Sequence, residues 1–189
     1  MEYALYVIGA VVGLGLLVAI MAKLYIWHTG VENVVAKLDS RSAFKLDKMT
    51  ENSLTFSTNV EFVNYGKQCA TFMDCFVRPQ LPYEQYDGLE LRGHAELSTA
   101  PREDDYFEAY IVQRKDYEDN LDHAVIKAQV TLIARHGMNI KEAVSKMPDF
   151  NFQIIWLQTG RTETRYRQVR IEVPAAEIAA LAGTELVDE

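Results

Sequence analysis

The chain has 189 residues, of which 49% are hydrophobic and 24% are charged. This balance is typical of a globular domain and excludes a disordered or low-complexity chain. The formal net charge of −8 lacks the basic footprint that proteins need to bind nucleic-acid backbones, so we expect no nucleic-acid partner. Two cysteines are too few for a disulfide scaffold or for a four-cysteine zinc site.

The N-terminal residues 1–27 predict a transmembrane anchor. The run from Tyr3 to Ala22 carries no charge, and a helix of that length is about 30 Å long, which matches the hydrocarbon core of a bilayer. A cleaved signal peptide is the alternative. It fits less well because residue 2 is Glu2, because the apolar run is longer than an h-region, and because no A-x-A cleavage pattern ends it. We therefore expect a single uncleaved span of the cell membrane.

Two glycines inside this span suggest a packing face. Gly9 and Gly13 are four residues apart, which is the small-xxx-small spacing that lets two membrane helices approach closely. They predict contact with a second copy or with another span, although glycine is also common in membrane helices generally.

The flanking charges predict the side of the membrane. Lys23, Lys37 and Arg41 follow the span, whereas only Met1 and Glu2 precede it. The positive-inside rule then places the C-terminal part in the cytoplasm. Cys69 and Cys75 agree with this side: in a strand they would lie about 20 Å apart, too far for a disulfide, and free thiols suit a reducing compartment.

Residues 28–40 predict a juxtamembrane helix or linker, because Thr29 and Glu32 have capping-box spacing and apolar residues recur at helical intervals. From residue 41 the apolar period changes to two, which predicts strands. They are expected at 42–49, 54–62, 68–77, 89–98, 106–113, 124–134, 150–159 and 164–173. Asn139 and Glu142 predict the start of a short helix. A last helix from Pro174 to Ala182 precedes an acidic tail.

These elements predict a mainly β domain, an antiparallel β-sandwich with short helices over 41–174, followed by a C-terminal helix and tail over 175–189. The stretch LTFSTNVEFVNYGKQCATFMDCFV, residues 54–77, resembles the opening hairpin of immunoglobulin-like domains of the late-embryogenesis-abundant type 2 (water-stress and hypersensitive response) kind. Asn64-Tyr65-Gly66 stands where the plant members usually carry Asn-Pro-Asn. The resemblance implies an immunoglobulin-like, non-enzymatic sandwich that is sometimes tethered to a membrane, with no catalytic residues.

Motifs for catalysis, phosphate binding or metal binding are absent from the sequence. The four histidines are scattered and read as surface residues, and neither cysteine has a family signature of a nucleophile. We therefore expect no enzyme activity, no catalytic residue, no cofactor and no metal. The acidic loop 116–122 offers several oxygen ligands, so calcium and a merely solvated loop both remain open as interpretations.

A local basic patch is the remaining candidate for interaction. Arg161, Arg165 and Arg167 lie together on the last predicted hairpin of an otherwise acidic domain, where they could meet anionic lipid or an acidic partner, or pair with glutamates across the strands. The sequence thus predicts a membrane-anchored binding or tethering module with an unidentified protein partner or self-association. The alternative is an accessory subunit of a larger membrane assembly that packs through Gly9 and Gly13.

Overall fold

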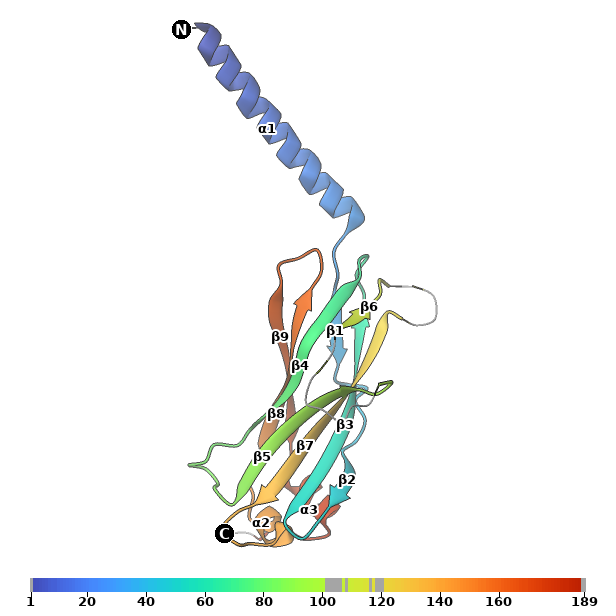
Figure 1. The fold of residues 1–189 in the computed structure, drawn as a ribbon, viewed down its shortest axis with the longest axis vertical. Helices are drawn as coiled ribbons and strands as arrows, with labels where there is room; N and C mark the ends of the chain where they lie inside the picture. Colours follow the sequence, from blue (N-terminus) through green and yellow to red (C-terminus); the bar gives the residue numbers. More distant parts are fainter. Residues whose placement is uncertain (1, 101–106, 108, 116, 118–120, 188–189) are drawn as a thin grey trace.

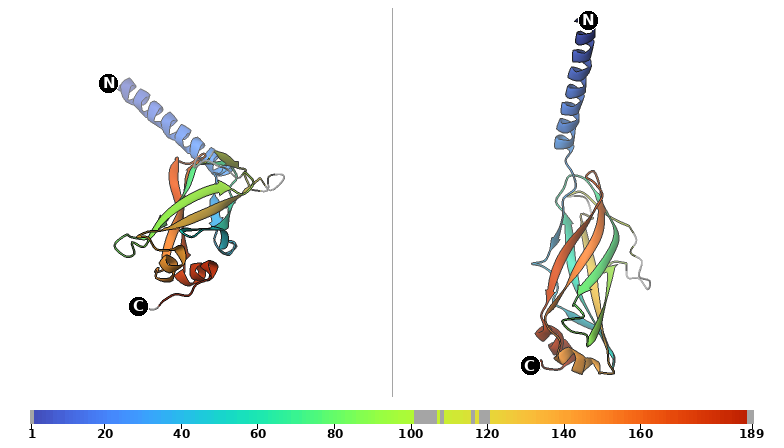
Figure 2. Two further views of the ribbon diagram at one scale, coloured as in Figure 1. Left: turned by 60° about the horizontal axis from the view of Figure 1, so that its bottom comes forward. Right: turned by 90° about the vertical axis from the view of Figure 1, so that its left-hand side faces the viewer.

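The structure is a computed structural model and describes residues 2–100, 107, 109–115, 117 and 121–187. A long N-terminal helix, α1 (Glu2–Thr29), is followed by two antiparallel sheets and two short helices (Figure 1). Figure 2 shows that α1 extends from one end of the sheets, whereas α2 (Ile140–Ser145) and α3 (Ala175–Ala182) lie at the opposite end. The predicted mainly β class with an N-terminal apolar helix is confirmed.

The two sheets are antiparallel throughout. Sheet A contains β1 (Val34–Lys37), β2 (Lys45–Met49), β3 (Ser53–Asn64), β5 (Leu89–Leu97) and β7 (His123–Ala134), in the order β1-β3-β7-β5 with β2 also paired to β3. Sheet B contains β4 (Ala70–Gln80), β6 (Tyr110–Val112), β8 (Phe150–Thr159) and β9 (Arg165–Val173), in the order β6-β4-β8-β9.

The sheets pack face to face around an aromatic cluster. Phe62 on β3 of sheet A contacts Phe72 on β4 and Trp156 on β8 of sheet B, with ring centroids 5.4 and 5.0 Å apart and near-perpendicular planes. Edge-to-face geometry of this kind is favourable because the positive ring edge meets the negative face of its neighbour. All three rings are buried, so the molecule is a two-layer β-sandwich with its core between the sheets.

A bulge in β4 explains why this strand is apolar on both faces. The pairing with β8 shifts between Met73 and Phe76, and Asp74 has a φ of 49°. One extra residue reverses the alternation of side chains, so that Phe72 before the bulge and Val77 after it both point into the core. The predicted strand over 68–77 is therefore confirmed, with an inward face that changes parity in its middle.

The predicted helix over 28–40 is wrong. Thr29 is the last residue of α1, and Gly30 ends the helix with a φ of +72° while its amide donates to Ile26 O at 2.8 Å. The chain then becomes extended and forms β1, which pairs with residues 61–64 of β3. The valines that produced the helical spacing are β-branched, and here pairing with a neighbouring strand decides their conformation.

The remaining local signals are confirmed, with shorter elements in places. Asn139 caps α2 by accepting from the Glu142 amide at 2.9 Å, and Gly183 ends α3 with a φ of 65°. The final hairpin joins β8 and β9 at the predicted turn. The first predicted strand, 42–49, is reduced to Lys45–Met49. Part of the predicted strand 106–113 lies outside the described residues, and the strand that the structure shows there is Tyr110–Val112.

Candidate functional site

The end of the sandwich next to α1 is built around a neck, residues 30–33, that joins the helix to β1. Gln68 donates to the carbonyl of Thr29 at 2.9 Å, and the Arg161 guanidinium donates to the Thr29 hydroxyl at 2.6 Å. The Arg161 guanidinium also lies 5.9 Å from the centre of the Tyr25 ring. Both sheets therefore contact the end of the helix, sheet A through the turn after β3 and sheet B through the β8–β9 hairpin.

Glu32 holds the neck to the hairpin. Its carboxylate accepts hydrogen bonds from the amides of Arg161 and Thr162, at 2.9 and 3.1 Å, and from the Thr162 hydroxyl. The residue is buried, and Gly160 leaves the room it needs, since a Cβ there would lie 2.5 Å from the Glu32 carboxyl carbon. A charged acceptor for two backbone amides and a hydroxyl is a strong local tie.

The protonation of Glu32 follows from these contacts. Burial acts to raise its pKa, but the hydrogen bonds from Thr162 and from the two hairpin amides outweigh burial and hold the pKa below its ordinary value of 4.5. A carboxyl whose pKa is lower in the folded state stabilises the fold above the pKa of the unfolded chain. That contribution is lost as the pH falls through the folded-state pKa.

Asn64, the last residue of β3, is fully buried and connects three segments. Its Oδ1 accepts from the amides of Asn33 in the neck and Gly66 in the turn, at 3.0 and 2.9 Å. Its Nδ2 donates to the carbonyls of Gln68 and Gln113 at 2.8 and 2.9 Å. The neck, the β3–β4 turn and the segment after β6 are thereby fixed to one another.

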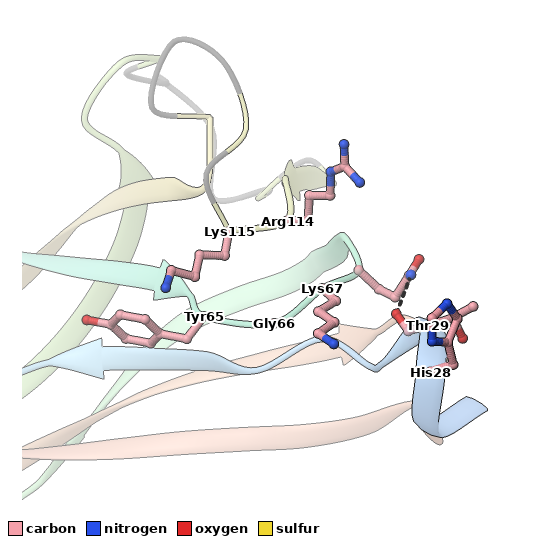
Figure 3. Close-up of a pocket in the computed structure, with 8 residues that line it drawn as sticks. His28, Thr29, Tyr65, Gly66, Lys67, Arg114 and Lys115 are labelled. Atoms are coloured by element: carbon pink, nitrogen blue, oxygen red, sulfur yellow. Dashed lines mark hydrogen bonds between the residues drawn. The ribbon is translucent and has the colours of Figure 1, made fainter. Parts of the chain in front are cut away.

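A cleft of about 650 Å³ lies between the end of α1, the β3–β4 turn and the segment after β6. The basic cleft, as we call it, is lined by His28, Thr29, Tyr65, Gly66, Lys67, Gln68, Arg114 and Lys115. Figure 3 shows the lining side chains coming from the helix end, from the turn and from the segment after β6. The exposed side chains of Lys67 and Arg114 make the cleft a place where a negatively charged group can bind.

Gly66 shows how closely the cleft walls approach each other. A Cβ at this position would lie 2.4 Å from the backbone of both Val31 and Asn33, so only glycine lets the turn pack on the neck. The amide of Lys67 donates to Val31 O at 3.1 Å, and that of Lys115 donates to Gly66 O at 2.9 Å. The cleft is therefore formed by hydrogen-bonded backbone rather than by side chains alone.

Of the three arginines that the sequence predicted as one patch, Arg161 lies in the turn after β8 and the other two lie on β9. Arg161 turns toward the helix end, as described above. Arg165 and Arg167 lie opposite Gln158 and Trp156 on the same face of sheet B. Arg165 is exposed, Arg167 is half-buried, and Arg170 forms an ion pair with Glu172 at 3.2 Å. Whether Arg161, Arg165 and Arg167 form an interaction patch stays a prediction.

The other sequence-predicted sites lie apart from the cleft. Gly9 and Gly13 have no neighbouring atom within 4 Å of an added Cβ, so that face of α1 is open to a second helix. Among the described residues no group of histidine, cysteine and acidic side chains could hold a metal ion. The acidic loop 116–122 lies largely outside them. Its last residue, Asp122, has its carboxylate 3.4 Å from His123 Nε2.

The thiols differ in environment. Cys69 is exposed in the β3–β4 turn, whereas Cys75 is buried in the β4 bulge. Burial, with the nearby Asp74 carboxylate, raises the pKa of Cys75 to about 12, which leaves it protonated at neutral pH. Both thiols are free, as predicted.

Sequence reasoning missed the basic cleft. His28, Lys67, Arg114 and Lys115 belong to distant stretches of chain, and no local pattern joins them. The one available signal was Asn64-Tyr65-Gly66, which correctly predicted a turn but did not indicate which segments the turn would contact.

Comparisons with known proteins leave the family open. No family model matches the chain, and no curated protein matches it. Two solved structures share a distant likeness. The GAE domain of yeast GGA1 is 9% identical, with a TM-score of 0.36, and the match covers 75% of this chain and 98% of that one. The GAE domain of GGA2p from Saccharomyces cerevisiae is 8% identical, with a TM-score of 0.28, and the match covers 70% and 98%.

Likenesses at such low identity and TM-score indicate neither a shared family nor a shared function. The resemblance of residues 54–77 to the late-embryogenesis-abundant type 2 domains also stays a prediction, since no family model supports it.

Replacing Glu32 by Gln tests the tie between the neck and the hairpin. We expect Glu32→Gln to lower the free energy of unfolding by about 2 kcal/mol at pH 7, because the hairpin loses a charged acceptor. The difference from the parent protein should shrink as the pH falls below about 4.5 and should be lost below the lowered folded-state pKa, where the parent carboxylate is itself protonated. Urea unfolding of the full chain in detergent micelles, followed by near-ultraviolet circular dichroism, measures both effects.

The matched control is Glu163→Gln, an exposed glutamate of the same hairpin. It should change stability by less than about 0.5 kcal/mol. A Glu32→Gln loss that is equal at pH 7 and at pH 3 would contradict the assigned role of the carboxylate charge.

Proposed function

We propose that the chain is a single-pass membrane protein that presents a non-enzymatic, immunoglobulin-like β-sandwich as a protein-binding module. The observation that carries the proposal is α1, whose segment Tyr6–Thr29 is 24 residues long, apolar enough to span a membrane and not buried by the rest of the protein. Side chains such as Leu14, Leu17 and Ile20 are about three-fifths exposed, which is costly in water and favourable in a bilayer.

The immunoglobulin-like assignment rests on strand order. If β1 and β2 together are lettered A and the later strands except β6 are lettered in chain order, sheet A reads A-B-E-D. The strands β4, β8 and β9 of sheet B read C-F-G. This is the arrangement of a constant-type immunoglobulin domain, with β6 as an additional strand beside C.

A binding role suits the chemistry of the described residues better than catalysis does. The buried thiol of Cys75 is held protonated, so it is a poor nucleophile. His123 and His136 both lie beside carboxylates, Glu61 at 2.7 Å and Asp87 at 3.2 Å, in contacts that suit a surface role. Anchoring such a module in the membrane confines it to two dimensions and raises its effective concentration toward a partner protein or a second copy.

The proposed location is the cell membrane with the sandwich on the cytoplasmic side. Lys23, Lys37 and Arg41 support this orientation through the positive-inside rule. The free thiols of Cys69 and Cys75 support it as well, because free cysteines suit a reducing compartment.

The anchor is tested by the mass and the extractability of the protein in its native membrane. We expect the intact mass of 21.5 kDa and retention in the membrane pellet after an alkaline carbonate wash. Leu14→Arg with Leu17→Arg should release the protein, since each arginine near the centre of a span costs about 3 kcal/mol. The paired control, Leu14→Ile with Leu17→Ile, should stay in the pellet. A mature chain that lacks the N-terminal segment would instead establish a cleaved signal sequence.

Cys69 offers a test of orientation, because it is exposed while Cys75 is buried. A membrane-impermeant maleimide should leave intact cells unlabelled and should label the chain once the membrane is opened. Cys69→Ser should abolish that labelling and so prove which thiol reacts. Labelling of intact cells would place the sandwich outside.

The second candidate function is an accessory subunit of a larger membrane assembly. The open space around Gly9 and Gly13 favours it, because a second helix can approach the backbone there. Gly9→Leu with Gly13→Leu should reduce crosslinking between helices in membranes by at least about fivefold, whereas Val11→Leu, on another face of the helix, should leave it unchanged. Crosslinks to one stoichiometric foreign span support the subunit role, and self-crosslinks alone support the anchored module.

A further inference from the structure

We propose that the basic cleft binds a phosphate-bearing anion, carried by an anionic lipid headgroup or by a soluble phosphate. The proposal deepens the proposed function, because it assigns a ligand to the end of the sandwich that faces the proposed membrane anchor. It concerns residues other than the predicted arginine patch.

The first argument for an anion site is the charge of the cleft. Lys67 and Arg114 bring exposed cationic side chains to one cleft, and no carboxylate is among the described residues that line it. In a chain of net charge −8, such a grouping is a departure from the average surface. Lysine and arginine bind phosphate through charge-assisted hydrogen bonds, with arginine able to make two at once.

Two carboxylates of the described residues at this end, those of Glu32 and Asp122, have partners of their own. The Glu32 carboxylate is taken up by the amides of Arg161 and Thr162 and by the Thr162 hydroxyl. The Asp122 carboxylate is buried and lies 3.4 Å from His123 Nε2. Neither of these two carboxylates lines the cleft.

The second argument is the position of the cleft at the end of α1. His28 and Thr29 belong both to the end of α1 and to the wall of the cleft. The rings of Tyr25 and Trp27, 62% and 80% exposed, lie at this end of the helix, and such rings favour the level of lipid headgroups. With α1 across a bilayer, the cleft opens where lipid phosphates lie. A lipid headgroup is therefore the source that the geometry favours.

The third argument is the rigidity of the backbone around the cleft. Asn64 joins the neck, the turn and the segment after β6, and the close approach at Gly66 leaves little freedom between them. The backbones bearing Lys67 and Arg114 are thus held in place before any ligand arrives, which lowers the ordering cost of binding.

The two tryptophans of the chain make the test specific. Trp27 is 80% exposed beside the cleft residue His28, whereas Trp156 is buried between the sheets. The full chain is reconstituted in vesicles of phosphatidylcholine that contain a spin-labelled lipid as a quencher of Trp27 fluorescence. The spin-labelled lipid carries either a phosphatidic acid or a phosphatidylcholine headgroup, at equal mole fraction.

We expect the phosphatidic acid quencher to quench Trp27 more strongly than the phosphatidylcholine quencher. The cleft variant, Lys67→Glu with Arg114→Glu, should lose this preference, because each cation near an anionic lipid contributes about fivefold in affinity. The control variant, Lys48→Glu with Lys141→Glu, makes the same change in net charge at exposed positions near the opposite end and should keep the preference.

Equal quenching by both lipids in the parent protein together with no saturable response to inorganic phosphate, or a lipid preference that survives in the cleft variant, would overturn the proposal. Absence of quenching by either lipid would instead contradict the membrane anchor, so the two proposals fail in distinguishable ways. The parent-protein comparison needs no substitution, so it stands even where a variant folds poorly.

A second arm separates lipid from soluble phosphate. Inorganic phosphate is titrated into vesicles of phosphatidylcholine alone while Trp27 emission is followed. A saturable change that the cleft variant lacks, together with no preference between the quenching lipids, assigns the phosphate site to a soluble ligand. A lipid preference without that change assigns it to a headgroup.

Discussion

The helix-proximal end of this protein depends on the buried side chain of Asn64. Its carboxamide bonds to the neck, to the β3–β4 turn and to the segment after β6, and these are segments that no single sheet holds together. Breaking any of these bonds leaves a polar atom unpaired in the interior, which costs more than the bond itself contributes. One buried amide therefore fixes the relative positions of three segments, two of which, the β3–β4 turn and the segment after β6, line the basic cleft.

Glu32 complements this arrangement by joining the two sheets at the same end. It precedes β1 of sheet A and accepts hydrogen bonds from the β8–β9 turn of sheet B. In the proposed setting, α1 supplies membrane affinity, and the neck fixes the distance between the helix end and the sandwich. The cleft then presents cations at the level of the headgroups. Anchor, neck and cleft act as one unit because hydrogen bonds, rather than a loose linker, connect them.

Sequence reasoning succeeded where a structure depends on neighbours along the chain. Asn139 and Glu142 predicted the start of α2, Gly183 the end of α3, and the alternation around Phe56 the face of β3. It failed over 28–40, where Thr29 and Glu32 matched a capping box. In the structure, the Thr29 hydroxyl bonds back to Tyr25 O and the Glu32 carboxylate bonds to a hairpin about 130 residues away. A capping box is formed only when a helix follows it, and here residues 34–37 pair with β3 and form a strand instead.

The sequence by itself determined the long apolar helix, the change to a period of two, most turns and the mainly β class. All of these follow from hydrophobic periodicity and from the backbone preferences of glycine, proline and asparagine. Only the tertiary structure decided the strand order, the parity change in β4, the contact of Arg161 with the end of α1, and the basic cleft. The physical reason is that a cleft is made by charges and hydrogen bonds between segments remote in sequence, whose meeting depends on how the two sheets pair and pack.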